Sequence, residues 1–247
     1  MMITNLFKLL YHRYSIVQQY LEGYWMLWWR ATTPPGDGKL INPYQQRVLS
    51  IIQGSLPSFR QEGNRFYEES PDLLKIVEAE FVNIGYGERS VTIYFGVHVP
   101  EVHKLVGREK ILEPIGVGDC VFLCNINEVA QGFNGRPARR YWTLGGYSRQ
   151  AYRQIKQIMA GTVFPFAQKV NSLASFNAFI DSIHHTSKEF PRYPVQLLLL
   201  KYLAKKDDEV KKITRELLKR DPIYFGPCIS GINKNLAKHG LRPITKD

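Results

Sequence analysis

The sequence predicts an α+β fold in which an antiparallel β-sheet meander is packed by helices, with helical N-terminal and C-terminal segments. Three observations predict it. Apolar residues recur every three or four positions before residue 54 and after residue 146, as amphipathic helices require. Between these regions apolar and polar residues alternate, which is typical of half-buried strands. Short turn sequences rich in glycine, proline and asparagine separate the alternating runs.

The composition is that of a globular chain with a surplus of positive charge. Of its 247 residues 44% are hydrophobic, which is enough for a packed core. Lys and Arg number 33 against 22 Asp and Glu, a formal net charge of +11, so nucleic acid, anionic lipid or an acidic protein should be attracted. Cys120, Cys124 and Cys228 cannot all pair, and no secretory segment is expected, so we predict a cytoplasmic location.

Residues 1–38 are predicted to form an aromatic N-terminal helix and a Pro/Gly linker. An apolar stripe of helical spacing runs through the first 28 residues, and charged residues interrupt it too often for a membrane-spanning helix. The alternative is that the aromatic cluster at residues 24–30 lies in a membrane interface. We expect it to contact protein instead, because leaving its indole rings in water would expose a large apolar patch.

Residues 39–145 are expected to form an α+β domain with an antiparallel sheet. A helix is predicted over residues 43–53, and the apolar period then changes to two. Strands are predicted at residues 65–69, 73–84 and 91–99. In the last of these one face should meet the core and the other should not: the core side is Val91, Ile93, Phe95 and Val97, and the opposite side is Thr92, Tyr94 and His98.

The remaining strands of this domain are predicted from turn sequences. The Gly-Tyr-Gly-Glu-Arg turn at residues 85–89 should join the two long strands as an antiparallel hairpin. A turn at residues 116–119 precedes a strand at 120–126, and Asn134-Gly135 should form the turn into a strand at 139–144. The economical arrangement is a meander of about four or five strands.

Residues 146–247 are predicted to form a helical segment packed on the sheet. Apolar residues of helical spacing mark helices at residues 152–159, 173–183, 194–203 and 210–218. The helix at 194–203 is nearly all apolar and should be buried on most sides. It should form an αα-hairpin with the charged helix that follows.

Part of the predicted sheet resembles a known family. Residues 59–67, Phe-Arg-Gln-Glu-Gly-Asn-Arg-Phe-Tyr, and residues 90–97, Ser-Val-Thr-Ile-Tyr-Phe-Gly-Val, are similar to strand motifs of an uncharacterised bacterial domain-of-unknown-function family. The resemblance covers residues 59–144, and Tyr94 stands where the family usually has Asn. It implies an antiparallel sheet; no catalytic residues are established for the family, so it supplies none for this chain. Some members look like toxin-neutralising (immunity) proteins, which implies a binding role.

Two groups of residues could be taken for a metal-dependent active site or a zinc site, but each departs from the pattern that such a site requires. Asp72, Glu78 and Glu80 resemble a metal-dependent nuclease core, yet Glu80 stands where a Lys is needed. A solvated strand face is the simpler interpretation. Cys120 and Cys124 would lie about 13 Å apart on one strand, too far for a shared zinc ion. We therefore predict no metal, no cofactor and no catalytic residue, and leave open whether the chain is an enzyme.

A cluster of basic and aromatic residues is the best candidate binding site. Arg forks pair with phosphate or carboxylate, and aromatic rings stack on bases or on guanidinium groups. The candidate residues, called here the basic-aromatic rim, are Arg136, Arg139, Arg140, Tyr141, Trp142, Arg149 and Arg153. Alternation along the strand places Arg139 and Tyr141 on one face and Arg140 and Trp142 on the other, so we expect one pair to be exposed while the other packs. The alternative is that these residues form a solvated sheet edge. The basic helix at residues 205–220 carries interspersed acidic residues, and we interpret it as a solvated helix face.

These observations predict a non-enzymatic binding protein of bacterial type that acts by contact with a macromolecular partner. The resemblance adds a toxin-neutralising or defence-associated role. The partner is expected to be an acidic protein or a nucleic acid rather than a membrane surface. The alternatives are a nucleic-acid-associated protein that uses the basic-aromatic rim and an unassigned nuclease or hydrolase.

Overall fold

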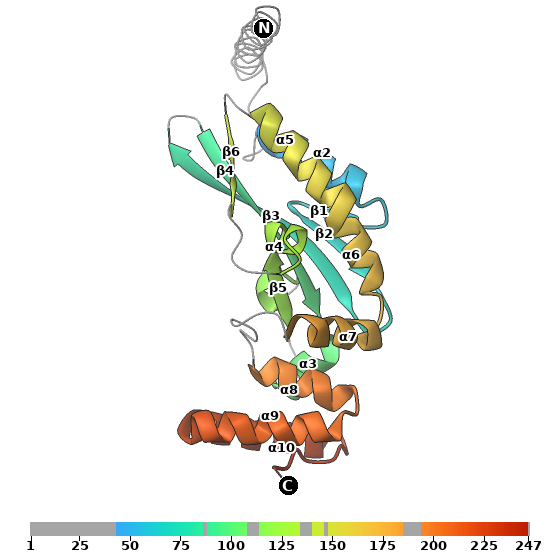
Figure 1. Cartoon of the computed structure of the whole chain (residues 1–247), viewed down its shortest axis with the longest axis vertical. Coiled ribbons are helices and arrows are strands. Elements are labelled where there is room, and N and C mark those ends of the chain that lie inside the picture. The colour runs from blue at the N-terminus through green and yellow to red at the C-terminus, as the bar shows by residue number, and fades with distance from the viewer. Residues whose placement is uncertain are drawn as a thin grey trace, which may run out of the picture.

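The computed structural model describes residues 43–85, 88–107, 114–133, 140–145, 148–184 and 194–246. The predicted aromatic helix and linker of residues 1–38 lie outside the described residues. Within them the chain has the expected α+β fold, with one antiparallel sheet and helices packed against one of its faces and below its end (Figure 1).

In the described residues the sheet has six strands, and every strand pair among them is antiparallel. They are β1 (Arg60–Glu62), β2 (Arg65–Glu69), β3 (Leu74–Gly85), β4 (Glu88–His98), β5 (Phe122–Asn125) and β6 (Trp142–Leu144). Their order is β1-β2-β3-β4-β5, and β6 also pairs with β4. The antiparallel pairing of β3 with β4 confirms the predicted hairpin, and Gly85 pairs with Glu88 near its closed end.

The predicted hairpin between the strands on either side of Asn134-Gly135 is wrong. β5 pairs with residues 94–97 of β4, and β6 pairs with residues 89–91 of the same strand. The two short strands therefore lie one after the other along a single edge of β4. β5 ends early because Asn125 begins helix α4 (Ile126–Ala130): its side chain accepts from the Asn127 N–H, and Glu128 accepts from the Asn125 N–H.

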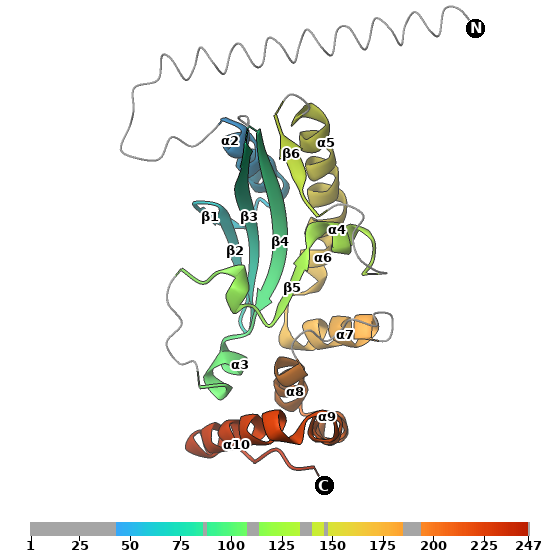
Figure 2. The ribbon, with the colours of Figure 1, turned by 90° about the vertical axis from the view of Figure 1, so that its left-hand side faces the viewer.

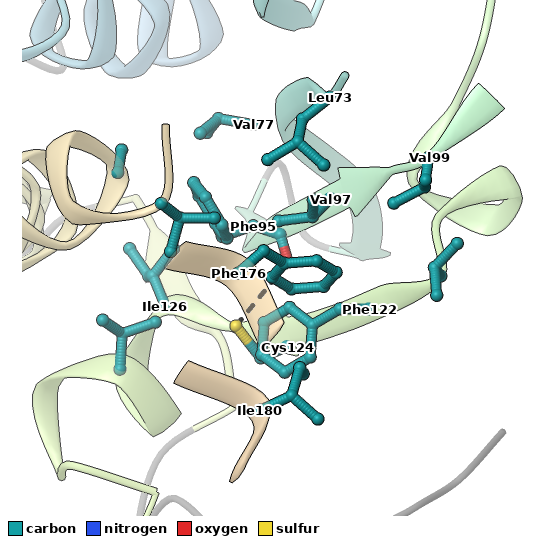
Figure 3. Packing of buried hydrophobic residues seen from close by; sticks show 14 of the residues in the cluster. Leu73, Val77, Phe95, Val97, Val99, Phe122, Cys124, Ile126, Phe176 and Ile180 are labelled. Atoms are coloured by element: carbon teal, nitrogen blue, oxygen red, sulfur yellow. Dashed lines mark hydrogen bonds between the residues drawn. The ribbon is translucent and has the colours of Figure 1, made fainter. Parts of the chain in front are cut away.

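The core lies between the sheet and a layer of helices. Val91, Ile93, Phe95 and Val97 are all 0% exposed, which confirms the predicted core face of β4. This face is covered by α2 (Pro43–Ser55), α5 (Ser148–Ile158) and α6 (Phe164–Lys169), while α7 (Leu173–His184) crosses its lower end (Figures 1 and 2). Figure 3 shows Phe122, Phe176 and Ile180 gathered beside Phe95.

Helices α5 and α6 are joined by a π-helical turn, η2 (Met159–Val163). The Phe164 N–H reaches back five residues to the Met159 carbonyl. Pro165 has no N–H to donate, so it cannot continue a regular α-helical ladder from the preceding turn. The wider turn keeps the polypeptide helical through this point, and α5 and α6 together span the long axis of the sheet (Figure 1).

A strap formed by residues 114–121 crosses the other face of the sheet. Its carbonyls at Pro114 and Ile115 accept hydrogen bonds from Arg65 Nη1 and Tyr67 Oη, each at 2.9 Å. The Val117 N–H donates to Glu78 Oε2 at 3.1 Å, within η1 (Val117–Asp119). These side chains come from β2 and β3, so the sheet holds the strap in place.

The strap requires the glycine at position 96. A Cβ atom there would lie 2.5 Å from the Cys120 Sγ, closer than side chains can approach. The Cys120 thiol is 7% exposed, and its burial raises its pKa, so it remains a neutral thiol. The strap also explains why His98 is 1% exposed although it lies on the outer face: its Nδ1 lies 2.9 Å from the Asp119 carbonyl oxygen.

The helices described beyond the lower end of the sheet come from two parts of the chain (Figure 2). They are α3 (Pro100–Leu105), α8 (Pro194–Leu203), α9 (Asp207–Arg220) and α10 (Pro222–Lys238). The predicted αα-hairpin of α8 and α9 is confirmed. Within residues 146–247, α5, α6 and α7 lie against the sheet, whereas α8, α9 and α10 form a separate layer below it (Figure 2).

Paired charges attach this lower layer to α7. Lys201 on α8 is 3% exposed and forms an ion pair with Asp181 of α7. Lys206 Nζ lies 2.7 Å from the other oxygen of Asp181, and Glu209 lies 3.2 Å from Lys201 and 3.1 Å from Lys206. Burial opposes ionisation of Asp181, but hydrogen bonds and charge from the two lysines prevail and lower its pKa below the ordinary value.

Replacing Asp181 by asparagine is expected to destabilise the protein in a pH-dependent way. Because the folded-state pKa lies below the ordinary 3.8, the ion pairs stabilise the fold above that pH and lose their effect as pH falls through the folded pKa. The difference in unfolding free energy between wild type and Asp181→Asn should be constant from pH 7 to about pH 5 and shrink at lower pH. Urea unfolding at a series of pH values measures it. A difference that grows on acidification would contradict the assignment.

Candidate anion-binding face

The structure describes five of the seven residues of the basic-aromatic rim. Arg136 and Arg139 lie outside the described residues. Arg140 and Tyr141 come just before β6, and both are exposed, Tyr141 by 54%. The Arg140 carbonyl accepts a 2.7 Å hydrogen bond from Asn125 Nδ2, which fixes the backbone of this segment against the end of β5.

Trp142 lies in the core and not on the surface where we predicted a binding site. Its side chain is 1% exposed, and its indole N–H donates to Gln154 Oε1 on α5 at 3.2 Å. The reason is strand alternation: Trp142 pairs with Val91, which faces the core. The expected pairing of Arg140 with Trp142 on one face does not hold: Trp142 is buried but Arg140 is exposed, because Arg140 lies before the first residue of β6.

The other two described rim residues lie on the outward side of α5. Arg149 and Arg153 are exposed, and Lys156 continues the same stripe. Their spacing of four and then three residues places them on one side of the helix, over about 10 Å of its length. The opposite side of α5, with Ala151 and Ile155, is buried against the core.

A fourth cation reaches this stripe from α2. Arg47 is exposed, and its guanidinium carbon lies 4.8 Å from the ring centroid of Tyr152 on α5. Stacking on the ring holds the guanidinium at the seam between the two helices. We call the surface formed by Arg47, Arg149, Arg153 and Lys156 the α2–α5 face.

The helical layer that carries this face contains no carboxylate. The sequence has no Asp or Glu between Asp37 and Glu62, or between Glu128 and Asp181, and these two stretches supply all of α2, α5, η2 and α6. By contrast α9 has Asp207, Asp208 and Glu209 in its first turn among its lysines. The positive charge of the α2–α5 face is therefore not offset within its own layer, whereas that of α9 is.

The α2–α5 face is polar as well as basic. Exposed side chains between its cations are amides and a hydroxyl, supplied by Gln46, Ser50, Gln150 and Gln157. Among the described residues the exposed large hydrophobic side chains are Val82, Tyr141, Ile223, Tyr224 and Leu241, and none of them belongs to α2 or α5. The face offers hydrogen-bond donors and positive charge without an apolar centre.

Asp72, Glu78 and Glu80, which resemble a nuclease core in the sequence, do not form a metal-binding group in the described structure. Glu78 accepts from the strap and lies 3.2 Å from Arg65 Nε, so it is engaged in structure. Asp72 lies exposed in the turn before β3, and Glu80 is exposed further along that strand. In the parts of the chain that the structure describes, no three His, Cys, Asp or Glu side chains are grouped to hold a metal ion.

His98, His103 and Cys124 are likewise part of the packing. The rings of His98 and His103 lie against each other with centroids 4.5 Å apart, between β4 and α3. Cys124 is buried and donates to the Phe95 carbonyl at 3.6 Å (Figure 3). Together with the neutral Cys120 thiol, these groups contribute to the fold.

Comparisons with known proteins add no functional information about this face. Protein-family models, curated proteins and solved structures give no match to the chain. None of the helices that the structure describes is long and apolar enough to cross a membrane. The site is therefore interpreted from its own geometry and charge.

Proposed function

We propose that this chain is a non-enzymatic binding protein that contacts a macromolecular anion through the α2–α5 face. The observation that carries the proposal is the absence of any carboxylate from the helical layer around Arg47, Arg149, Arg153 and Lys156. Positive charge gathered on one surface raises the local concentration of anionic partners and speeds their association.

The arrangement of the cations favours a polymer over a small anion. The four side chains are exposed and spread over the outward sides of two helices. An exposed ion pair contributes only about 0–1 kcal/mol, so a single small anion that meets one of them would bind weakly. A polyanion that meets several at once accumulates these contributions.

The toxin-neutralising role implied by the resemblance of residues 59–144 is a narrower hypothesis. It rests on strand motifs, and such motifs carry less information about function than about fold. If this face binds a toxin, the contact surface of that toxin must be acidic.

Heparin chromatography tests the proposal with a generic polyanion. The double variant Arg149→Gln, Arg153→Gln should elute at clearly lower salt than wild type, because two cations of the acid-free layer are removed. The matched control is Arg215→Gln, Lys219→Gln, which has the same spacing and charge change on exposed positions of α9.

The control should elute close to wild type, because Glu216 and the other acids of α9 already offset its charge. Circular dichroism and thermal unfolding would verify that both variants fold. Equal shifts from the two variants would show that only net charge matters, and an unchanged elution of the α5 variant would overturn the proposal.

A further inference from the structure

We propose that the partner of the α2–α5 face is a double-stranded nucleic acid, bound through its phosphates without reading of base sequence. This inference rests on the proposed function and names its partner. Three features of the face support it: the kind of donor, the absence of stacking surfaces, and the spacing of the cations.

The donors on this face suit phosphate oxygens. Three of its four cations are Arg, whose planar guanidinium can present two parallel N–H groups to one phosphate. Gln46, Gln150 and Gln157 add exposed amide groups between them. Contacts to phosphate and sugar in nucleic-acid complexes come from Arg, Lys and amide side chains such as these.

The surface chemistry disfavours the other anionic partners. Single strands are held by bases that stack on exposed aromatic rings, and here Tyr152 is 6% exposed and already covered by Arg47. A protein interface has an apolar or aromatic centre, and insertion into an anionic membrane requires exposed apolar side chains. In the described residues α2 and α5 expose no large hydrophobic side chain.

The spacing of the cations matches the charge density of a duplex. The stripe from Arg149 to Lys156 covers about 10 Å, and a duplex carries one negative charge per about 1.7 Å of its axis, so several phosphates lie within reach of one helix. With four cations engaged, the logarithm of the binding constant should fall with the logarithm of salt concentration with a slope of about −3.6. The Kd at physiological salt should lie in the range of about 10⁻⁴ to 10⁻⁶ M, as for sequence-independent binding.

Fluorescence anisotropy with the full chain tests this inference. The probes are two labelled DNA duplexes of about 20 base pairs with unrelated sequences, an RNA duplex, and the separated DNA strands, each titrated at several salt concentrations. Both DNA duplexes should bind equally and more tightly than either single strand. Arg149→Gln with Arg153→Gln should reduce the magnitude of the salt slope by about 2, and Arg47→Gln by about 1. The control Arg215→Gln, Lys219→Gln should leave the slope unchanged.

Each outcome decides the inference. Tighter binding of single strands, or a strong difference between the two DNA sequences, would overturn it, because the face would then read bases. Binding to heparin without binding to any duplex would overturn it while leaving the proposed function standing. Loss of binding to heparin and to duplex alike would overturn both. A preference between DNA and RNA duplexes would identify which source supplies the phosphates and would support the inference in either case.

Discussion

Replacing Lys75 by methionine is expected to lower the free energy of unfolding by about 3–5 kcal/mol. Lys75 is 2% exposed on the core face of β3, where it forms an ion pair with Glu68 of β2. Its ammonium also donates to the Ala167 carbonyl at 3.0 Å, near the C-terminus of α6, where carbonyls lack helical partners. Methionine keeps most of the volume but leaves the Glu68 carboxylate and this carbonyl without the ammonium.

A double-mutant cycle with Glu68→Gln separates the ion pair from packing. Because a buried pair replaced as a whole costs far less than one charge left alone, Lys75→Met with Glu68→Gln should recover a large part of the loss. Urea unfolding of the four proteins measures the coupling. A single-variant loss below about 1 kcal/mol, or a double variant that is worse than Lys75→Met, would show that the pair is not structurally important.

Replacing Phe95 by alanine is expected to cost a similar amount, about 3–5 kcal/mol. Its ring is 0% exposed and makes an edge-to-face contact with Phe166, with centroids 5.2 Å apart. The residues around it come from the sheet and from the helical layer, so the cavity cannot be closed by the movement of one loop (Figure 3).

Thr92→Ala on the opposite face of the same strand is the control for this substitution. Thr92 is half-buried and pairs with Glu80 across the strands, so its replacement should cost less than about 1 kcal/mol. Chemical denaturation of both variants gives the comparison. Costs in the reverse order would mean that the two faces of β4 are assigned the wrong way round.

The faces of the central strands could be predicted from sequence because side chains alternate strictly along a strand. The residues from Val91 to Val97 show this pattern, and the structure confirms it. The short strand β1 was missed because three residues are too few to show a period. The end of β5 was placed wrongly, although the Asn125 and Glu128 spacing is a helix-start signal that is visible in the sequence.

Longer-range features could not be predicted from local patterns. His98 has the spacing of an outward-facing residue, but it is buried because the strap crosses it, and the strap is held by side chains from β2 and β3. Arg47 joins the α2–α5 face through a contact between helices that are distant in the chain. The sequence shows that residues 38–61 and 129–180 contain no Asp or Glu. Only the fold shows that these two stretches lie side by side and form one layer.

The division of one sheet edge between β5 and β6 has a consequence for behaviour at high concentration. Long unpaired edge strands act as templates for pairing with other chains. In the described part of the chain, one edge of the sheet is the exposed three-residue β1, and the other is split into strands of four and three residues with α4 between them. Within the described residues β5 and β6 pair with residues 94–97 and 89–91 of β4, so this long strand offers no continuous unpaired edge on that side, and concentrated protein should resist pairing of sheets along it.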